Sequence, residues 1–120
     1  MRQPFSTRQW KHYEGYKYLA VWKNVVRLRE TIRDFTKTLP RGEYRRKIQM
    51  DDSARSVQRN IEEGYKRPTT KEYLDFLGFS QGSLEEVKGD VRDCLRDGFI
   101  REEFHDEFIA RVKNTINRSY

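Results

Sequence analysis

The sequence predicts an all-α protein, an antiparallel four-helix bundle whose successive helices run up, down, up and down. Apolar residues recur at spacings of three and four along four segments, which is the period of a helix with one buried face. The breaks between these segments carry helix-ending or helix-starting residues at Pro40, at Gly64 to Thr69 and at Gly98. No segment shows a convincing strand pattern. Helices joined by short turns pack as antiparallel neighbours, so a bundle is the expected architecture.

Length and composition indicate one folded domain. The chain has 120 residues, of which 37% are charged and 35% hydrophobic, so its core must be small and its surface highly charged. The aromatic content of 13% and the clear periodicity argue against disorder. We expect residues 1–15 to form an N-terminal arm and residues 16–120 to form the bundle. Aromatic residues in and just after the arm could pack on the bundle or on a neighbouring chain: Phe5, Trp10, Tyr13 and Tyr16.

The first two helices are predicted at about residues 18–38 and 43–63, separated by Pro40-Arg41-Gly42. The predicted buried stripe of the first helix consists of Leu19, Trp22, Val25, Val26, Ile32, Phe35 and Leu39. The predicted stripe of the second helix consists of Tyr44, Ile48, Asp51, Ala54, Val57 and Ile61.

The connection to the third helix carries the clearest local signals. Gly64 follows a helical pattern and is predicted to take the left-handed conformation that closes a helix, with Pro68 just beyond it. Thr69 is the predicted N-cap of the next helix, and Glu72 is its partner in a capping box. The third helix should then continue to Gly98, a plausible C′ residue.

The fourth helix is predicted from about residue 101 to residue 117. Apolar residues recur along it at a spacing of four residues, at Phe104, Phe108, Val112 and Ile116. Acidic residues near its start suit the positive end of the helix dipole.

Gly78 and Gly82 share one face of the third helix, and Ser83 keeps that region small. Each glycine costs about 1 kcal/mol relative to alanine in a helix interior. We therefore predict that these residues allow another helix or another subunit to approach closely. The alternative is that the glycines are tolerated and have no role.

The charge of the chain is unevenly distributed. Residues 1–67 contain 17 Lys/Arg and 8 Asp/Glu, whereas residues 68–120 contain 8 Lys/Arg and 11 Asp/Glu, for a net charge of +6 overall. A basic half suggests a surface that faces a polyanion. Equally, the two halves could complement each other within a subunit or between subunits.

Basic residues along the second helix are the candidate nucleic-acid contacts, since Arg and Lys can follow a phosphate backbone. They lie near its start, along its middle and at its end: Arg41, Arg45, Arg46, Lys47, Arg55, Arg59, Lys66 and Arg67. The alternative interpretation is a solvated helix face neutralised by nearby acids.

Catalysis is not expected, because the sequence offers no plausible constellation of acid, base and nucleophile. His12 and His105 are far apart, and Cys94 is predicted to be a small buried side chain. No metal or cofactor motif is present, so neither a metal nor a cofactor is expected. The single cysteine, the lack of a long apolar stretch and the lack of a secretory signal favour a cytoplasmic protein with no membrane partner.

The order and spacing of several short motifs resemble the four-helix bundle family first associated with intervening sequences in bacterial 23S rRNA. The resemblance covers about residues 16–112, and its strongest part runs from Ser56 to Gly64. Further matching motifs are Tyr16 with Leu19-x-Val21-Trp22, Leu39-Pro40, Glu43-Tyr44 with Gln49, Lys71-Glu72-Tyr73, Phe76-Leu77 and Gly82-Ser83-Leu84. The chain departs from the family at Asp51-Asp52, where many relatives carry an Arg-Arg pair.

The resemblance implies a bundle that assembles as a ring-like homopentamer. The family includes the accessory variability determinant of diversity-generating retroelements, whose basic ring is thought to engage nucleic acid and a reverse transcriptase. We therefore expect a non-catalytic homo-oligomer that binds RNA or DNA, with a reverse transcriptase or a ribosomal component as a possible protein partner. The alternative is a scaffold ring that docks a protein and does not bind nucleic acid directly. The exchange at Asp51-Asp52 removes positive charge from the middle of the second helix.

Overall fold

The computed structural model describes residues 15–113 and 115–116 of the 120-residue chain. They form four α-helices, α1 (Ala20–Thr36), α2 (Tyr44–Tyr65), α3 (Thr70–Arg96) and α4 (Glu102–Val112). Two short 3-10 helices, η2 (Gly15–Tyr18) and η3 (Arg41–Glu43), precede α1 and α2. These residues contain no strand, so the predicted all-α, four-helix fold is confirmed.

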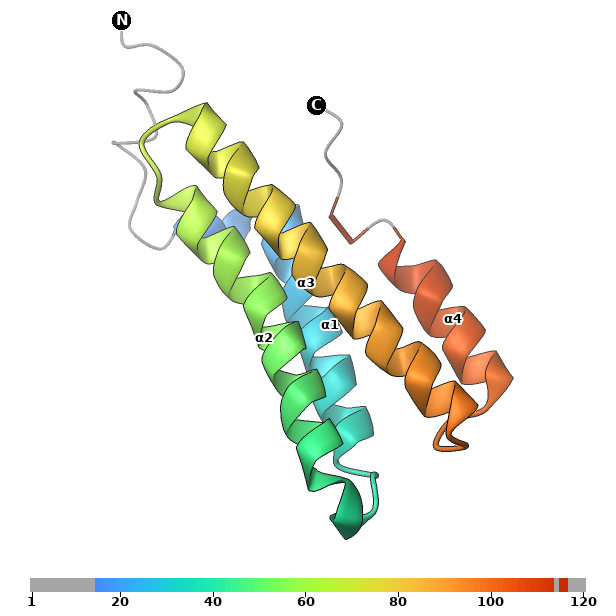
Figure 1. The fold of residues 1–120 in the computed structure, drawn as a ribbon. Coiled ribbons are helices and arrows are strands. Elements are labelled where there is room, and N and C mark those ends of the chain that lie inside the picture. The colour runs from blue at the N-terminus through green and yellow to red at the C-terminus, as the bar shows by residue number, and fades with distance from the viewer. Residues whose placement is uncertain (1–14, 114, 117–120) are drawn as a thin grey trace, which may run out of the picture.

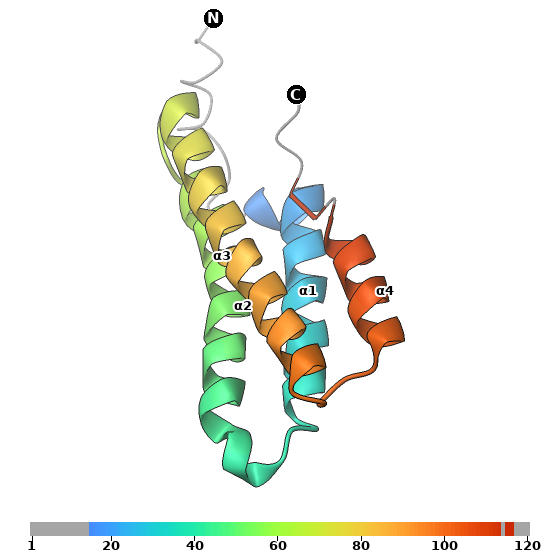
Figure 2. The same cartoon turned by 45° about the vertical axis from the view of Figure 1, so that its right-hand side comes forward.

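The connections between successive helices lie at alternate ends of the molecule. Figure 1 shows the α1–α2 and α3–α4 turns at the lower end and the α2–α3 turn at the upper end. Helix α2 packs against both α1 and α3. Helix α4 lies on the opposite side of the molecule from α2, next to α1 and α3 (Figure 2).

The core lies between the inner faces of the four helices. It consists of Val25, Leu28, Ile32, Met50, Ala54, Val57, Ile61, Leu77, Leu84, Val87, Val91, Cys94, Phe108, Val112 and Ile116. Most of these residues belong to the predicted apolar stripes, and the removal of their side chains from water is the main force that holds the helices together.

The stripe predicted for α2 is wrong at its start, because Tyr44 and Ile48 are 58% and 53% exposed. The buried face instead runs through Met50, Ala54, Val57 and Ile61. Extending this face back by one helical turn leads to Arg46 and Lys47, which are half-buried.

The turn between α2 and α3 confirms Thr69 as the N-cap of α3. The backbone N–H of Glu72 donates to Thr69 Oγ1 at 3.2 Å, which is the N-cap bond, while Thr69 Oγ1 donates to the Glu72 carboxylate at 2.8 Å. Gly98 also has the predicted left-handed conformation, with φ of 85°, and the Phe99 N–H donates to the Cys94 carbonyl at 2.8 Å.

The prediction that Gly64 ends α2 in a left-handed conformation is wrong. It lies inside α2, which continues to Tyr65, and among the described residues Gly98 alone has a positive φ. A Cβ atom on Gly64 would lie 2.8 Å from Phe76 Cβ, closer than real side chains approach. The glycine is therefore needed because α3 crosses α2 there, and it does not end the helix.

The two ends of the chain are described only in part. The Tyr16 ring packs against Trp22 and Tyr65, with centroid distances of 5.6 and 6.1 Å, which ties η2 to α1 and α2. Phe5, Trp10 and Tyr13 of the predicted arm lie outside the described residues. Helix α4 ends at Val112, earlier than predicted, although Thr115 and Ile116 beyond it are buried.

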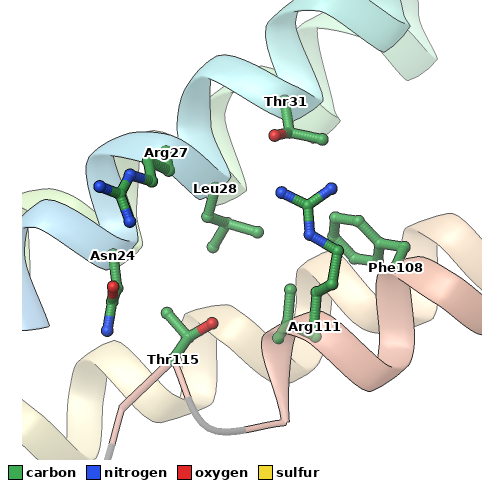
Figure 3. A pocket seen from close by; sticks show the side chains of 8 residues that line it. Asn24, Arg27, Leu28, Thr31, Phe108, Arg111 and Thr115 are labelled. Carbon is green, nitrogen blue, oxygen red and sulfur yellow. The ribbon is translucent and has the colours of Figure 1, made fainter.

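Helix α4 contacts α1 chiefly through aromatic rings at the end near the α3–α4 turn. Phe104 stacks on Phe35 of α1 at 5.7 Å and on Phe108 at 6.3 Å. Farther along, a cavity lies between the two helices (Figure 3).

Candidate nucleic-acid interface

The face of α2 that points away from the bundle carries a row of exposed arginines. Arg45, Arg55 and Arg59 are exposed and fall near one line along the helix, given its 3.6-residue period. Arg41 in η3 is also exposed and extends the row at its start. We call these four residues the arginine stripe. The opposite face of α2 is buried against α1 and α3, which is why the stripe faces outward.

The guanidinium groups of the stripe are available to an external anion. Within the described part of the chain, none of the four forms an ion pair with a carboxylate closer than 4 Å. A guanidinium can donate two parallel hydrogen bonds to a phosphate, so such a row suits a nucleic-acid backbone.

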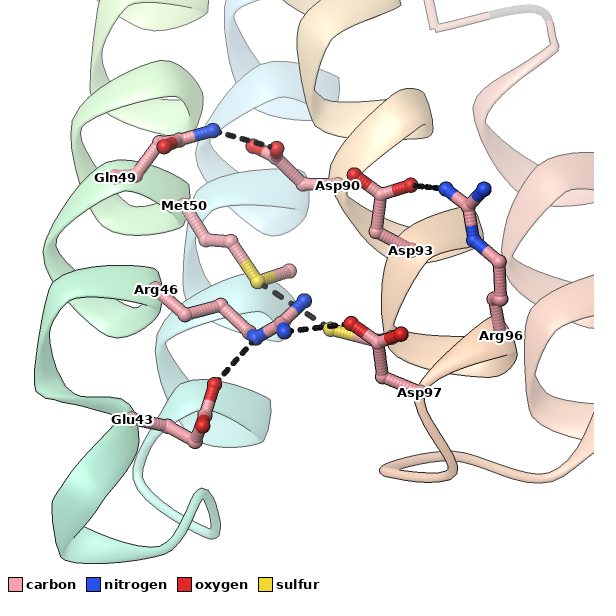
Figure 4. Close-up of polar contacts among 9 residues, drawn as sticks. Glu43, Arg46, Gln49, Met50, Asp90, Asp93, Arg96 and Asp97 are labelled. Atoms are coloured by element: carbon pink, nitrogen blue, oxygen red, sulfur yellow. Dashed lines mark hydrogen bonds and ion pairs between the residues drawn. The ribbon is translucent and has the colours of Figure 1, made fainter.

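Arg46, the third arginine predicted near the start of α2, is engaged inside the molecule. Its Nε donates to Glu43 and its Nη2 donates to Asp97, both at 2.7 Å (Figure 4). The guanidinium also lies 5.0 Å from the centre of the Phe99 ring. The bonds to Glu43 and Asp97 raise the pKa of Arg46 further above its already high value. Arg46 therefore links the start of α2 to the end of α3.

The other predicted basic residues have mixed environments. Lys47 donates to Asp51 at 2.7 Å and lies 3.5 Å from the Thr36 hydroxyl. Arg67 is half-buried with its guanidinium 4.7 Å from the centre of the Phe76 ring, whereas Lys66 is exposed. Lys47 and Arg67 are half-buried and therefore differ from the stripe residues, which are exposed.

Two basic residues that the sequence did not single out join the stripe from α1. Arg29 and Arg33 line a hollow together with Asp51, Asp52 and Arg55 of α2, and Arg29 also donates to Gln58 at 3.3 Å. Their spacing of four residues places them on one face of α1 and could have been noticed in the sequence. Only the packing of α1 on α2 shows that this face adjoins Arg55.

Asp51 and Asp52, in the middle of α2, differ in whether a neighbouring side chain compensates their negative charge. Asp51 accepts bonds from Lys47 and from the Thr36 hydroxyl, at 2.7 and 2.8 Å, so its charge is compensated. Asp52 is exposed and has no ion-pair partner among the described residues. It lies between Arg45 and Arg55 in the sequence and on the same outward face. Asp52 and Glu63 line a hollow that also contains Arg55 and Arg59, so both acids weaken the positive potential of the stripe.

The small residues of α3 separate into two groups. Ser83 is buried, and its hydroxyl lies 2.8 Å from the Ser56 hydroxyl, so it contributes to the packing of α3 on α2. A Cβ atom on Gly78 or Gly82 would meet nothing within 4 Å, so neither glycine serves a close helix contact within the chain. Next to them, Phe79 is 56% exposed.

Asp90 is the most unusual carboxyl group of the structure. It is 8% exposed, accepts a bond from Gln49 at 2.9 Å, and its Oδ2 atom has no partner among the described residues (Figure 4). Burial raises the pKa of Asp90, nearby Asp93 and Glu86 add to this, and the Gln49 bond opposes it.

Cys94 and His105 have different environments in the described part of the chain. Cys94 is fully buried with its sulfur 3.7 Å from that of Met50, and burial raises the pKa of its thiol, which disfavours the thiolate. His105 contacts the neighbouring Asp106 at 3.0 Å.

Within residues 15–113 and 115–116, no three His, Cys, Asp or Glu side chains are grouped to hold a metal ion. No helix there combines the length and apolar character needed to cross a membrane.

Comparison with protein-family models gives one match that spans almost the whole chain. Residues 17–119 match the model described as 23S rRNA-intervening sequence protein. No curated protein matches the chain.

Proposed function

Because the chain belongs to the 23S rRNA-intervening sequence protein family, we propose that it is a non-catalytic, homo-oligomeric bundle that binds RNA or another nucleic acid through the arginine stripe of α2. The observation that carries the proposal is the exposure of Arg41, Arg45, Arg55 and Arg59 on one face without ion pairs among the described residues. The net charge of +6 adds long-range attraction to a polyanion.

The proposed mode of binding is electrostatic and tolerant of sequence. The stripe presents guanidinium groups on a convex helix surface, which suits phosphate contacts. Reading single-stranded bases usually needs side chains on which the bases stack. Tyr44, which is 58% exposed beside Arg45, is the one aromatic residue of α2 placed to add such a contact.

The test is an affinity measurement with two matched triple variants. The first replaces Arg45, Arg55 and Arg59 with glutamine. The control replaces Arg92, Arg101 and Lys113, three exposed basic residues of the α3–α4 side, with glutamine. Filter binding to a structured RNA at low salt should show at least a tenfold loss for the stripe variant and a much smaller loss for the control. Equal losses, or no binding by the parent protein, would refute the proposal.

The homo-oligomeric part of the proposal is supported by the outward face of α3. Gly78 and Gly82 leave room beside the exposed Phe79, so a second copy of the chain could approach the helix backbone there. A Cβ atom at position 82 meets nothing within 4 Å in its own chain, so Gly82→Leu should leave the fold intact and block assembly. Light scattering coupled to size exclusion would show this as a smaller particle with an unchanged helical spectrum. A strict monomer at micromolar concentration would contradict the assembly, and five copies is the number that the resemblance predicts.

A second candidate is a scaffold that docks a protein. It is favoured by the exposure of two apolar side chains of α2, Tyr44 and Ile48, beside the arginines. A partner protein bound there should be lost with Tyr44→Ala and Ile48→Ala and should depend weakly on salt. A reverse transcriptase or ribosomal partner stays a prediction of the family resemblance, and a cytoplasmic location stays a prediction of the sequence.

A further inference from the structure

The cavity between α1 and α4 has the features of a small-molecule site and lies away from the arginine stripe. Its volume is about 320 Å³, at the lower end of the range typical of ligand pockets. It lies beyond the contact between Phe35 and Phe104 near the start of α4, and Phe108, which stacks on Phe104, also lines it.

The floor of the cavity is apolar. Leu28 of α1 and Phe108 and Val112 of α4 line it, and each of the three is 4% exposed. An apolar floor of this kind favours a ligand with a compact apolar or planar body, because the body then leaves water on binding.

Two arginines stand at the edges of the cavity, one from each wall. Figure 3 shows Arg27 projecting from α1 and Arg111 from α4, with the Arg111 guanidinium reaching toward Thr31 of α1. Arg27 has no ion-pair partner among the described residues, and Arg111 has only a long 4.0 Å contact with the exposed Glu107. Among the described residues no carboxylate lines the cavity, so its lining carries two positive charges and no negative one.

Neutral polar groups complete the lining. The amide of Asn24 and the hydroxyls of Thr31 and Thr115 are placed around the same space (Figure 3). They can donate and accept hydrogen bonds, which a purely hydrocarbon ligand would leave unmet.

From this combination we propose that the cavity binds a small organic anion, with a phosphate or carboxylate head held by Arg27 and Arg111. Its body would lie on Leu28, Phe108 and Val112 and bond to the neutral polar groups. Guanidinium groups bind both kinds of head through charge-assisted, often bidentate bonds. The site is independent of nucleic-acid binding, because it involves the α1–α4 side and none of the stripe residues.

The test uses methyl NMR signals of Leu28 and Val112 in the full chain. Adenosine 5′-monophosphate is the phosphate probe and benzoate is the carboxylate probe. Adenosine, which lacks the anionic head, and inorganic phosphate, which lacks the body, are the controls. We expect saturable shifts of both methyl signals with at least one organic anion at millimolar concentration, and much weaker effects from adenosine and from inorganic phosphate.

Variants assign the binding to the two arginines. Arg27→Gln and Arg111→Gln should each weaken binding about tenfold or more, whereas Arg92→Gln, an exposed arginine of α3, should leave it unchanged. The proposal is overturned if neither organic anion shifts the methyl signals. It is also overturned if inorganic phosphate or adenosine acts equally well, or if all three variants bind like the parent protein.

Discussion

At Gly64 the missing side chain determines how closely α3 can approach α2. A Cβ atom there would lie 2.8 Å from Phe76 Cβ and 3.4 Å from the Tyr73 backbone oxygen, and neither neighbour can move without moving α3. We expect Gly64→Ala to destabilise the fold by about 1–2 kcal/mol, because overpacking outweighs the gain in helix propensity. Gly89→Ala is the matched control in α3, where a Cβ meets nothing within 4 Å, and it should stabilise by about 0.5–1 kcal/mol. Urea unfolding measures both; stabilisation by Gly64→Ala would contradict this role.

Asp90 should make stability depend on pH in a direction opposite to that of an ordinary salt-bridged carboxylate. Its pKa is raised in the folded protein, so the folded state holds the proton more tightly than the unfolded state does. Stability therefore falls as pH rises from the ordinary value of 3.8 through the raised pKa. The groups that set this pKa are Gln49 and Arg46 on α2 and Glu86 and Asp93 on α3.

The variant Asp90→Asn removes this titration and keeps an oxygen that can accept the Gln49 bond. It should melt a few degrees higher than the parent protein at neutral pH, and the difference should shrink at acidic pH, where Asp90 is protonated. Thermal melts at several pH values measure this difference. A variant that melts lower than the parent at every pH would show that the ionised carboxylate is stabilising.

Helix α2 packs against α1 and α3 with one face and carries the arginine stripe on the other. Asp52 lies near the middle of this outward face. We expect Asp52→Asn to raise RNA affinity about two- to fivefold at low salt, since one exposed repulsive charge is worth roughly 0.5–1 kcal/mol. Glu102→Gln removes the same charge at the start of α4, on the other side of the molecule, and should change affinity less. If the two variants behave alike, net charge and not the α2 face controls binding.

Local signals in the sequence located the helices well, because caps and turns depend on neighbouring residues. The Thr69 cap and the left-handed Gly98 are of this kind. Gly64 was misread because a glycine before a proline indicates a helix end, and only the packing of Phe76 reveals its other role. The apolar character of Tyr44 and Ile48 predicts that they lie in the core, but both are exposed. In the structure, that part of the inward face belongs to Arg46 and Lys47, which are half-buried and paired with acids.

The arginine stripe could be predicted in part, because the helical spacing of its residues is also a local property of the sequence. The exposed arginines of α2 follow from helical spacing, which the sequence contains. Which arginines are neutralised depends on partners far along the chain, such as Asp97 for Arg46. The contribution of Arg29 and Arg33, and the cavity between α1 and α4, likewise depend on how helices pack against each other.

For the whole molecule, the arginine stripe lies on the outward face of α2, on the opposite side of the bundle from α4. The central claim is that this face holds nucleic acid by its phosphates. Such binding releases counterions, so the logarithm of the association constant falls linearly with the logarithm of the salt concentration. Each phosphate contact contributes about 0.7–0.9 to the slope.

The most direct measurement is this salt slope for RNA binding by the parent protein and by the variant with Arg45, Arg55 and Arg59 replaced by glutamine. We predict a steep slope for the parent protein and a slope shallower by about 2–3 for the variant, one unit or slightly less for each lost contact. The control with Arg92, Arg101 and Lys113 replaced should keep the parent slope. Identical slopes for the parent protein and the stripe variant would contradict the account.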